Sequence, residues 1–388
     1  MHLTPEFPPS KLPNVGTTIF SVMSQLAQEQ GAINLGQGFP GFPIDVELVS
    51  LVNQAMLDGF NQYAPMPGWP ALREAISHKM EMLWQMDVNS ASQITITAGG
   101  SQAIFTAISA LIQPGDEVIL FAPAYDCYAP AVELNGGIVK WVVLDYPNWE
   151  VPWEALENAY SSKTKLVMIN TPHNPTGKVW SKDEMSRMAD WIKEKGVFLI
   201  SDEVYEHITF DGRPHVSMAL YKEIHQQTML IYSFGKTFHA TGWKMGYAIG
   251  PEHWMVEFRK QHQFNVFTCN TPTQVAFANY MKDTNRYNLI SPMYQAKRDL
   301  MMKSMENSAF DWVLTEGTYF QLLKWNGNSE LSDVELAKKW TIENKVTLIP
   351  ISVFFPAQKD LRLFRLCFAK EDNELLEAAA RLNHIQCD

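Results

Sequence analysis

Short apolar or β-branched segments alternate with amphipathic ones through the middle of the chain. The apolar segments predict strands at 94–97, 117–121, 137–144, 166–170, 197–201 and 228–233. The stretches between them predict helices, most clearly at 101–112, 153–160 and 181–195. Strands that are apolar on both faces and alternate with helices are typical of a mainly parallel sheet covered on both sides. The pattern therefore predicts an α/β fold.

The pattern changes beyond residue 251. Helical stretches dominate to about residue 307, and strands are predicted near 318–325 and 361–368. We expect a large α/β domain at 46–285, with a mainly parallel sheet between helices, and a smaller α+β domain made of 1–45 together with 286–388. Periodicity by itself supports only the first of these two domains.

Composition and charge narrow the possible function classes. The chain has 388 residues, of which 46% are hydrophobic and 19% charged, so it can bury large cores and is not globally disordered. Its 31 basic and 42 acidic residues give a net charge of −11, which argues against nucleic acid or an anionic membrane as the main partner. No apolar run approaches the ~18 residues of a membrane span, and no secretory segment is recognisable. We expect a cytoplasmic protein.

The cysteines do not indicate a structural role. Cys127, Cys269, Cys367 and Cys387 form no CxxC pair and lack zinc-finger spacing. Four cysteines in a chain of this length do not make a disulfide scaffold, so we expect reduced, partly buried thiols. No metal site is predicted.

Three polar residues each follow a different predicted strand. Asn174 lies in an Asn-Pro-Thr-Gly turn, Asp202 directly follows a buried strand, and Lys236 lies in the turn after another. Because the carboxyl ends of parallel strands meet at one edge of a sheet, where ligands bind, we expect these side chains to lie together. A desolvated lysine there could form a Schiff base. Taken singly, the three have plainer interpretations: a tight turn, a helix N-cap and a surface lysine.

A candidate phosphate site lies at 97–102, where a strand, the diglycine Gly99-Gly100 and a helix start follow one another. The free backbone N–H groups of a helix N-terminus suit a phosphate. Ser233 and Lys244 could add a hydroxyl and a positive charge. The alternative is a plain strand-to-helix connection.

Arg365 is a candidate carboxylate ligand. In an extended segment 361–369 it shares a face with Leu361 and Leu363, where an unpaired guanidinium would be costly, and Arg362 lies on the opposite face. A carboxylate held bidentately would satisfy this guanidinium. A structural salt bridge is the alternative.

Together these motifs resemble the class-I aminotransferases, pyridoxal-phosphate enzymes of the aspartate-aminotransferase-like fold. The resemblance covers nearly the whole chain and is carried by motifs in the family's order: Asn34–Pro40, Asn61-Gln62-Tyr63 with Gly68 and Leu72-Arg73, the Asn-Pro-x-Gly turn at 174–177, Asp-x-x-Tyr at 202–205, and Ser-x-x-Lys at 233–236 followed by Gly-x-Lys-x-Gly at 242–246. The segments 35–40 and 235–244 are most similar to the kynurenine/glutamine aminotransferase branch and its bacterial methionine aminotransferase relatives.

The resemblance implies a role for each of these residues. Lys236 would hold pyridoxal 5′-phosphate as a Schiff base and then move a proton between the substrate Cα and the cofactor C4′. Asp202 would keep the pyridine nitrogen protonated, which makes the ring a better electron sink. Asn174 and Tyr205 would hydrogen-bond the ring 3′ oxygen, and Tyr125 would stack on the ring face.

The resemblance also assigns the anion sites. The phosphate would be held by groups from three segments: Gly100, Ser101, Gln102, Ser233 and Lys244. Tyr63 would reach it from the partner subunit of a homodimer. Arg365 would clamp the substrate α-carboxylate, with Asn174 and the Gly38 backbone assisting. Most family members carry arginine where Lys244 stands; lysine keeps the charge but loses the fork geometry.

The amino donor is expected to have a large, uncharged side chain. Family members that take dicarboxylic substrates present a second arginine from the partner subunit, but here no arginine occurs between Arg259 and Arg286, and 263–267 is aromatic. Phe20 and Tyr63 would add aromatic surface. We expect methionine first, then phenylalanine, tyrosine, glutamine or kynurenine, with a 2-oxo acid as acceptor in a ping-pong exchange.

Two other functions stay open at this point. A cysteine-S-conjugate β-lyase would use the same cofactor residues. A non-enzymatic regulator that binds pyridoxal phosphate is less favoured, because the N-terminus is too short for a helix-turn-helix and the net charge of −11 opposes DNA binding. The residues of a working site are also all present: Lys236, Asp202, Asn174, Tyr205 and Arg365.

Overall fold

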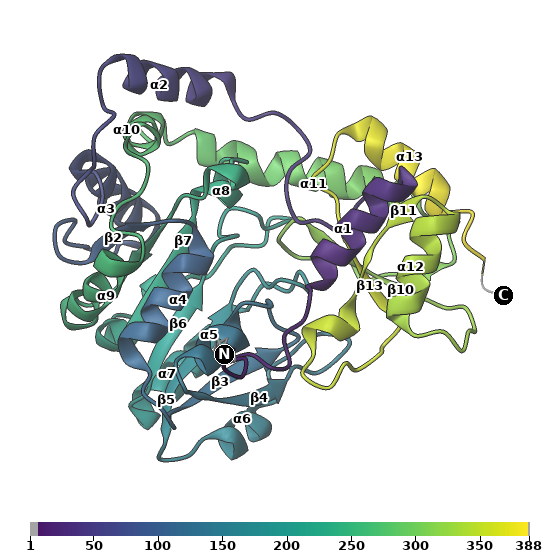
Figure 1. Ribbon diagram of the computed structural model, residues 1–388, viewed down its shortest axis with the longest axis horizontal. Coiled ribbons are helices and arrows are strands. Elements are labelled where there is room, and N and C mark those ends of the chain that lie inside the picture. The colour runs from purple at the N-terminus through teal and green to yellow at the C-terminus, as the bar shows by residue number, and fades with distance from the viewer. Residues whose placement is uncertain (1–6, 387–388) are drawn as a thin grey trace, which may run out of the picture.

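The computed structural model describes residues 7–386. Its larger part is a seven-stranded sheet, with strand order β2-β8-β7-β6-β5-β3-β4, between two layers of helices (Figure 1). The strands are β2 (Ile94–Thr97), β3 (Glu117–Ala122), β4 (Ile138–Val143), β5 (Thr164–Asn170), β6 (Phe198–Asp202), β7 (Thr228–Ser233) and β8 (Gly246–Ile249). Only β8 runs antiparallel to its neighbours in this sheet. The predicted α/β architecture is confirmed, although β8 was not predicted.

The strands read as continuous apolar runs because both faces of the sheet are covered. Val118 and Leu120 of β3 face one core, whereas Ile119 and Phe121 face the other. Burying both faces gains roughly 25 cal/mol per Å² of apolar surface on each side. The first core includes α4 (Gly100–Leu111), α5 (Tyr128–Leu134) and α9 (Glu252–Asn265). The second includes α3 (Pro70–Trp84), α6 (Trp153–Ala159), α7 (Lys182–Lys195), which begins with a capping box at Ser181, and α10 (Thr271–Tyr280).

A smaller group of elements combines both ends of the chain. β1 (Ile33–Asn34) pairs in parallel with β11 (Val346–Thr347), next to an antiparallel sheet of β12 (Ile349–Pro350), β13 (Leu363–Cys367), β10 (Phe320–Trp325) and β9 (Phe310–Asp311). Its helices are α1 (Ile19–Gln30), α12 (Asp333–Glu343) and α13 (Asp372–Leu382). α11 (Arg286–Ser304) runs between the two groups, and α2 (Val46–Leu57) lies at the far end of the larger one (Figure 1). The β1–β11 pairing supports a small domain built from both chain ends; its boundaries stay a prediction.

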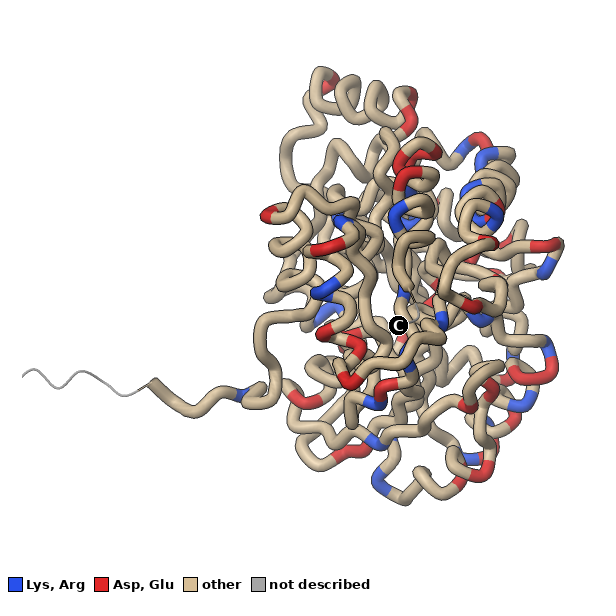
Figure 2. Tube along the Cα trace, turned by 90° about the vertical axis from the view of Figure 1, so that its right-hand side faces the viewer, with Lys and Arg blue, Asp and Glu red and all other residues tan. Residues whose placement is uncertain are grey.

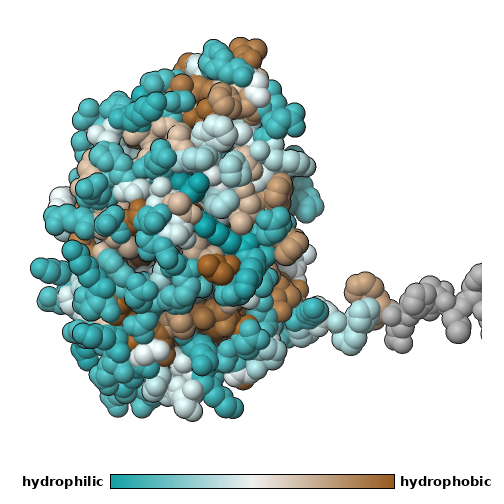
Figure 3. Space-filling model, turned by 90° about the vertical axis from the view of Figure 1, so that its left-hand side faces the viewer, coloured by the Kyte–Doolittle hydropathy of each residue, from teal (hydrophilic) through white to brown (hydrophobic). Residues whose placement is uncertain are grey.

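The surface carries both signs of charge. Basic and acidic residues are interspersed over the face shown in Figure 2. On the opposite side, apolar side chains gather at the upper end, where α2 lies (Figure 3). Within residues 7–386, no helix is long and apolar enough to span a bilayer, and no group of three His, Cys, Asp or Glu side chains could hold a metal ion.

The predicted reduced thiols are found where the structure describes them. Cys127, Cys269 and Cys367 are free, and the last two are buried. Cys387 lies outside the described residues. The cytoplasmic location stays a prediction.

Candidate active site

The carboxyl ends of β5, β6 and β7 open into a cavity of about 500 Å³. Asp202 is the last residue of β6 and pairs with Asn170 of β5 in the sheet register. Lys236 lies in α8 (Phe234–Thr237), a single helical turn that directly follows β7. Asn174, Asp202 and Lys236 all line the cavity, so the structure brings together the three residues predicted to meet at this edge.

Most of the other predicted site residues line the same cavity: Phe20, Gly38, Gly100, Ser101, Tyr125, Tyr205, Ser233, Lys244 and Arg365. Gln102 does not, because its side chain turns along α4. Its Oε1 accepts from the Ala98 N–H at 2.9 Å, and its Nε2 donates to Thr106 Oγ1 at 2.6 Å. Tyr63 also lies outside the cavity; it is 82% exposed and packs edge-on against Phe267.

The Lys236 amine is largely withdrawn from water. Its Nζ donates to the Tyr319 hydroxyl at 2.8 Å and lies 5.5 Å from the centre of the Tyr205 ring. Burial lowers the pKa of Lys236 to about 8, because the ammonium form loses hydration in the cavity. The neutral amine, which is the nucleophilic form, is therefore well populated near that pH.

Asp202 is a buried carboxylate that is 4% exposed. Its Oδ2 accepts a hydrogen bond from the Tyr128 hydroxyl at 2.5 Å. Burial raises the pKa of Asp202 to about 6, although Tyr128 and Lys236 act in the opposite direction. The residues that follow Asp202 form a turn, so the helix N-cap alternative is not found. A cationic group placed in the cavity would complete the environment of this carboxylate.

In the cofactor-free protein, Asp202→Asn is expected to raise stability at neutral pH. The folded pKa of Asp202 lies above its ordinary value of 3.8. Burial of the ionised carboxylate therefore lowers the free energy of unfolding. This loss begins near pH 4 and reaches its full size above about pH 6. The full cost is roughly 3 kcal/mol. We expect thermal unfolding to show a gain about twice as large at pH 8 as at pH 5. A variant less stable than wild type at pH 8 would contradict this.

The segment 202–206 is held by buried side-chain contacts. Glu203 accepts from His215 Nε2 at 2.9 Å, and Glu206 pairs with Lys79. All four side chains are buried and none lines the cavity, so the turn that follows Asp202 is held by contacts outside the site.

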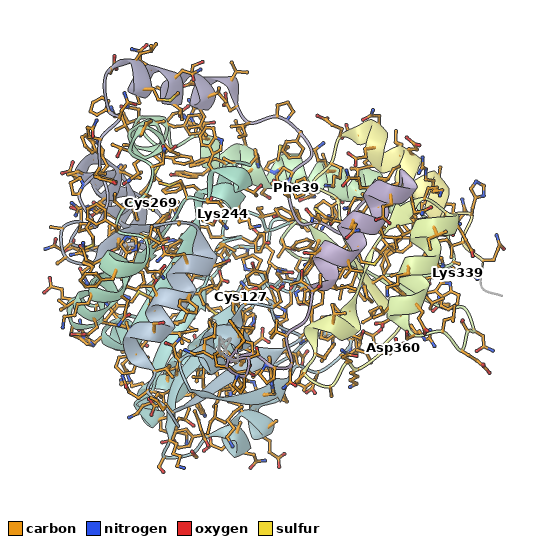
Figure 4. The ribbon with its side chains drawn as sticks, in the orientation of Figure 1. Phe39, Cys127, Lys244, Cys269, Lys339 and Asp360 are labelled. Atoms are coloured by element: carbon orange, nitrogen blue, oxygen red, sulfur yellow. The ribbon has the colours of Figure 1, made fainter. Side chains whose placement is uncertain are left out.

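The end of the cavity near Lys244 is shaped by close backbone approach. Gly99 has φ +81°, and a Cβ added there would lie 3.5 Å from Lys244 Nζ. α4 begins at Gly100, and no side chain caps its first N–H groups. Ser101 Oγ lies 3.2 Å from the Tyr125 hydroxyl. In Figure 4, Lys244 lies within the larger group of elements, just below α8. The backbone donors and the ammonium thus converge on one end of the cavity.

The turn at 174–177 is locked to the smaller group of elements. The Asn174 N–H donates to Asn170 Oδ1 at 2.7 Å, and the Gly177 carbonyl accepts from the Gly317 N–H at 2.8 Å. Gly177 has φ +75°, and a Cβ added there would lie 1.7 Å from Thr315 Oγ1. The glycine of this motif is therefore required by both conformation and space.

Gly177→Ala is expected to destabilise the protein by about 2–4 kcal/mol, because the strain of a left-handed alanine is added to the clash with Thr315. Gly212→Ala is a matched control, since Gly212 has φ +70° but nothing within 4 Å of an added Cβ. It should cost only about 1 kcal/mol. Denaturant unfolding measures both; equal losses would show that the Thr315 contact contributes nothing.

Arg365 lies in β13 and is 2% exposed. Its Nη1 donates to Asn174 Oδ1 at 2.7 Å and its Nη2 to the Gly36 carbonyl at 3.1 Å. Its Nε has no hydrogen-bond partner within residues 7–386. Three rings surround the guanidinium, those of Phe320, Phe354 and Phe20, at 3.9, 5.1 and 5.2 Å. The structural salt bridge is not found among the described residues, so a donor remains for an incoming anion.

A profile of the family described as "Aminotransferase class I and II" matches residues 30–382. The chain belongs to this family. Methionine aminotransferase of Escherichia coli (strain K12) is 44% identical over 386 residues, which cover 99% of this chain and all of that protein. Kynurenine–oxoglutarate transaminase of Dictyostelium discoideum is 35% identical over 417 aligned residues, covering 97% and 96%. A solved Escherichia coli structure, reported with a methionine aminotransferase function, superimposes with a TM-score of 0.95 at 43% identity, covering 98% and 100%.

The membership confirms the expected fold, enzyme class and cofactor. The chain is an aminotransferase of the aspartate-aminotransferase-like fold, and its cofactor is pyridoxal 5′-phosphate. The site fits that cofactor. A Cβ at Gly246 would lie 2.6 Å from the Tyr232 carbonyl oxygen, so this glycine keeps the strand close beside Gly99. Lys244 and the start of α4 suit a phosphate, Asp202 suits a protonated ring nitrogen, and Lys236 suits an aldehyde.

Sequence reasoning missed two tyrosines of this aminotransferase site. Tyr128 lies three residues after Tyr125, and their rings meet edge-on at 5.7 Å. Tyr128 is the first residue of α5 and Tyr125 precedes that helix, so their closeness in sequence was the usable signal. Tyr319 gave no such signal, because it is 83 residues away from its partner Lys236.

Proposed function

We propose that this aminotransferase moves the amino group of a large, uncharged L-amino acid, methionine first, to a 2-oxo acid in a ping-pong exchange. The observation that carries the proposal is the lining of the cavity, whose cationic side chains are Lys236, Lys244 and Arg365. Two of these suit the cofactor and one suits an α-carboxylate. The region 260–285, where the resemblance would place a dicarboxylate-binding arginine of the partner subunit, contains no arginine. The names of the similar proteins, methionine aminotransferase and kynurenine–oxoglutarate transaminase, point in the same direction.

Aromatic rings make up much of the remaining wall. Phe20, Phe39, Tyr125 and Phe320 line the cavity. A thioether is polarisable and packs well against aromatic rings, which favours methionine. Phenylalanine, tyrosine, glutamine and kynurenine are the further candidates.

Each cofactor-facing residue would have one task. Pyridoxal phosphate, when bound, supplies an electron sink for the carbanion at the substrate Cα. Asp202 would hold a proton at the ring nitrogen. Asn174 uses its Oδ1 for Arg365, so its Nδ2 is free to donate to the ring 3′ oxygen beside Tyr205. Lys236, as a free amine, would carry the proton between the substrate Cα and the cofactor C4′.

The two anions would be held by different sets of residues. The Gly100 backbone, Ser101, Ser233 and Lys244 would bind the phosphate, with Gln102 contributing its backbone N–H and Tyr125 covering the ring face. Arg365 would bind the α-carboxylate, using the Nε that has no partner among the described residues. The Gly38 backbone would close that end.

We expect kcat/KM for methionine to exceed that for aspartate by about 100-fold, because an aspartate side chain would place an unpaired carboxylate among aromatic rings. A screen of single amino donors with one fixed 2-oxo acid measures the ratio. Faster transfer from aspartate would contradict the pocket argument. A cysteine S-conjugate in the same screen identifies a β-lyase, since pyruvate, ammonia and a thiol would then form in place of the 2-oxo acid that keeps the sulfur.

We also propose a homodimer in which Tyr63 enters the phosphate site of the other subunit. Tyr63 lies outside its own subunit's cavity, and its ring is 82% exposed. Other large apolar side chains are similarly exposed, including Phe264 at 91%, Leu57 at 81% and Val46 at 77%. Contiguous exposed apolar side chains mark interaction surfaces in soluble proteins, and Val46 and Leu57 share α2.

Subunit complementation tests this arrangement. Hybrids of Tyr63→Ala and Lys236→Ala subunits would contain one site with an intact lysine and an intact tyrosine from the neighbour. Such hybrids should recover about half of the wild-type activity per dimer, well above either parent. If Tyr63 acted within its own subunit, no hybrid site would be intact and no activity would return.

A further inference from the structure

Tyr319 joins the Lys236 amine to the segment that carries Gly38. This tyrosine directly precedes β10 and is fully buried, and its hydroxyl donates to the Gly38 carbonyl oxygen at 2.6 Å. The same hydroxyl oxygen accepts from Lys236 Nζ at 2.8 Å, and that nitrogen lies 3.5 Å from the Gly38 oxygen. Three segments that are distant in sequence thus form one hydrogen-bonded triangle.

The position of the hydroxyl is fixed by packing. The Tyr319 ring meets Tyr205 edge-on at 5.2 Å and Tyr294 at 5.7 Å. Its carbonyl accepts from the Phe368 N–H at 3.0 Å, and a Cβ added to Gly38 would lie only 3.6 Å from its ring. A polar group held in this way is placed before any ligand binds.

We propose that Tyr319 is a positioning residue for Lys236, whose amine its hydroxyl anchors whenever that amine is not bonded to the cofactor. The hydroxyl gives its only proton to Gly38, so it can only accept from the amine. A neutral amine then directs one N–H to Tyr319 and the other towards Gly38. Its lone pair remains for the proton of the substrate Cα. The inference rests on the role proposed above for Lys236.

The competing explanation is that Tyr319 is only a packing residue. Tyr319→Phe separates the two, because it keeps the ring and removes the hydroxyl. Tyr294→Phe is a matched control: Tyr294 is equally buried and packs on the Tyr319 ring, but its hydroxyl contacts His239 Nδ1 at 2.8 Å. Thermal unfolding of both variants reports any loss of packing.

The first test uses the apoenzyme. The rate at which added pyridoxal phosphate develops its visible absorption is followed against pH, and the wild-type midpoint is expected near the Lys236 pKa of about 8. A hydroxyl oxygen that accepts from the ammonium favours the charged form, so its loss lowers the midpoint. We expect Tyr319→Phe to shift the midpoint down by about half to one pH unit and Tyr294→Phe to leave it unchanged.

The second test uses single turnovers with methionine and α-deuterated methionine. Tyr319→Phe should slow the turnover about tenfold and enlarge the isotope effect, while the donor KM changes less than about twofold. An unshifted midpoint together with an unchanged isotope effect would overturn the proposal. A Lys236→Ala enzyme that kept its activity would instead contradict the proposed role of the lysine, so the two failures are distinguishable.

Discussion

Lys236→Ala is expected to abolish both the visible absorption of the bound cofactor and the transfer of amino groups. The variant loses the amine that would bond the cofactor and the group that would move the proton at the substrate Cα. Removing both tasks should lower kcat by at least about 10⁴-fold. Because burial already lowers the pKa of Lys236 to about 8, alanine also removes a charge that folding disfavours, and the apoenzyme should stay folded.

Absorption spectra and steady-state rates of purified protein measure the two effects. Lys260→Ala is the control, since its ammonium lies at the surface in an ion pair with Glu257. It should leave the spectrum and rate unchanged. A Lys236→Ala protein that kept the absorption band and the rate would show that another residue bonds the cofactor.

Sequence reasoning could predict that three polar residues line one cavity because they lie at or just beyond the ends of strands. Asn174, Asp202 and Lys236 each come directly after a strand whose apolar pattern was plain, and a parallel sheet leaves one arrangement for them. The glycine at 177 and the diglycine at 99–100 could likewise be recognised locally, as turns. These predictions needed only the order of residues along the chain.

The rest of the site depends on approaches between distant segments. No local pattern predicts that Tyr319 meets Lys236, that Arg365 meets Asn174, or that Lys79 pairs with Glu206 across the core. Which side chains become partners depends on how distant elements pack against each other. A one-residue change in strand register would bring different side chains together.

The residue just before β13 also shows that a local sequence pattern does not predict every contact. An extended 361–369 was expected to place Arg362 on the face opposite Arg365. The strand begins at Leu363, however, and Arg362 has φ +53°, so it does not lie on the strand. Its guanidinium turns to the carbonyls of Ser329 and Leu331. A left-handed residue ended the alternation on which the prediction relied.

Arg362 is therefore a suitable control position for a substitution of Arg365. Arg365→Met is expected to lower kcat/KM for methionine by about 10²–10³-fold, because the α-carboxylate would lose a charge-assisted partner in a buried site. The loss should fall mainly on KM, since the carboxylate is bound in the ground state and the transition state alike. Arg362→Met removes an arginine that binds two backbone carbonyls and pairs with Asp360 at 3.7 Å, and it should change kcat/KM by less than about twofold.

Both half-reactions are expected to depend on the Arg365 guanidinium. The amino donor and the 2-oxo acid each carry an α-carboxylate, so Arg365→Met should weaken both by a similar factor, whereas a pocket for the side chain would distinguish them. The visible absorption of the cofactor should persist, because the hydrogen bonds of Arg365 go to Asn174 and Gly36 and not to Lys236 or Lys244. Stopped-flow measurements of each half-reaction give the two factors. A loss confined to one substrate, or no larger than that of Arg362→Met, would remove Arg365 from the carboxylate site.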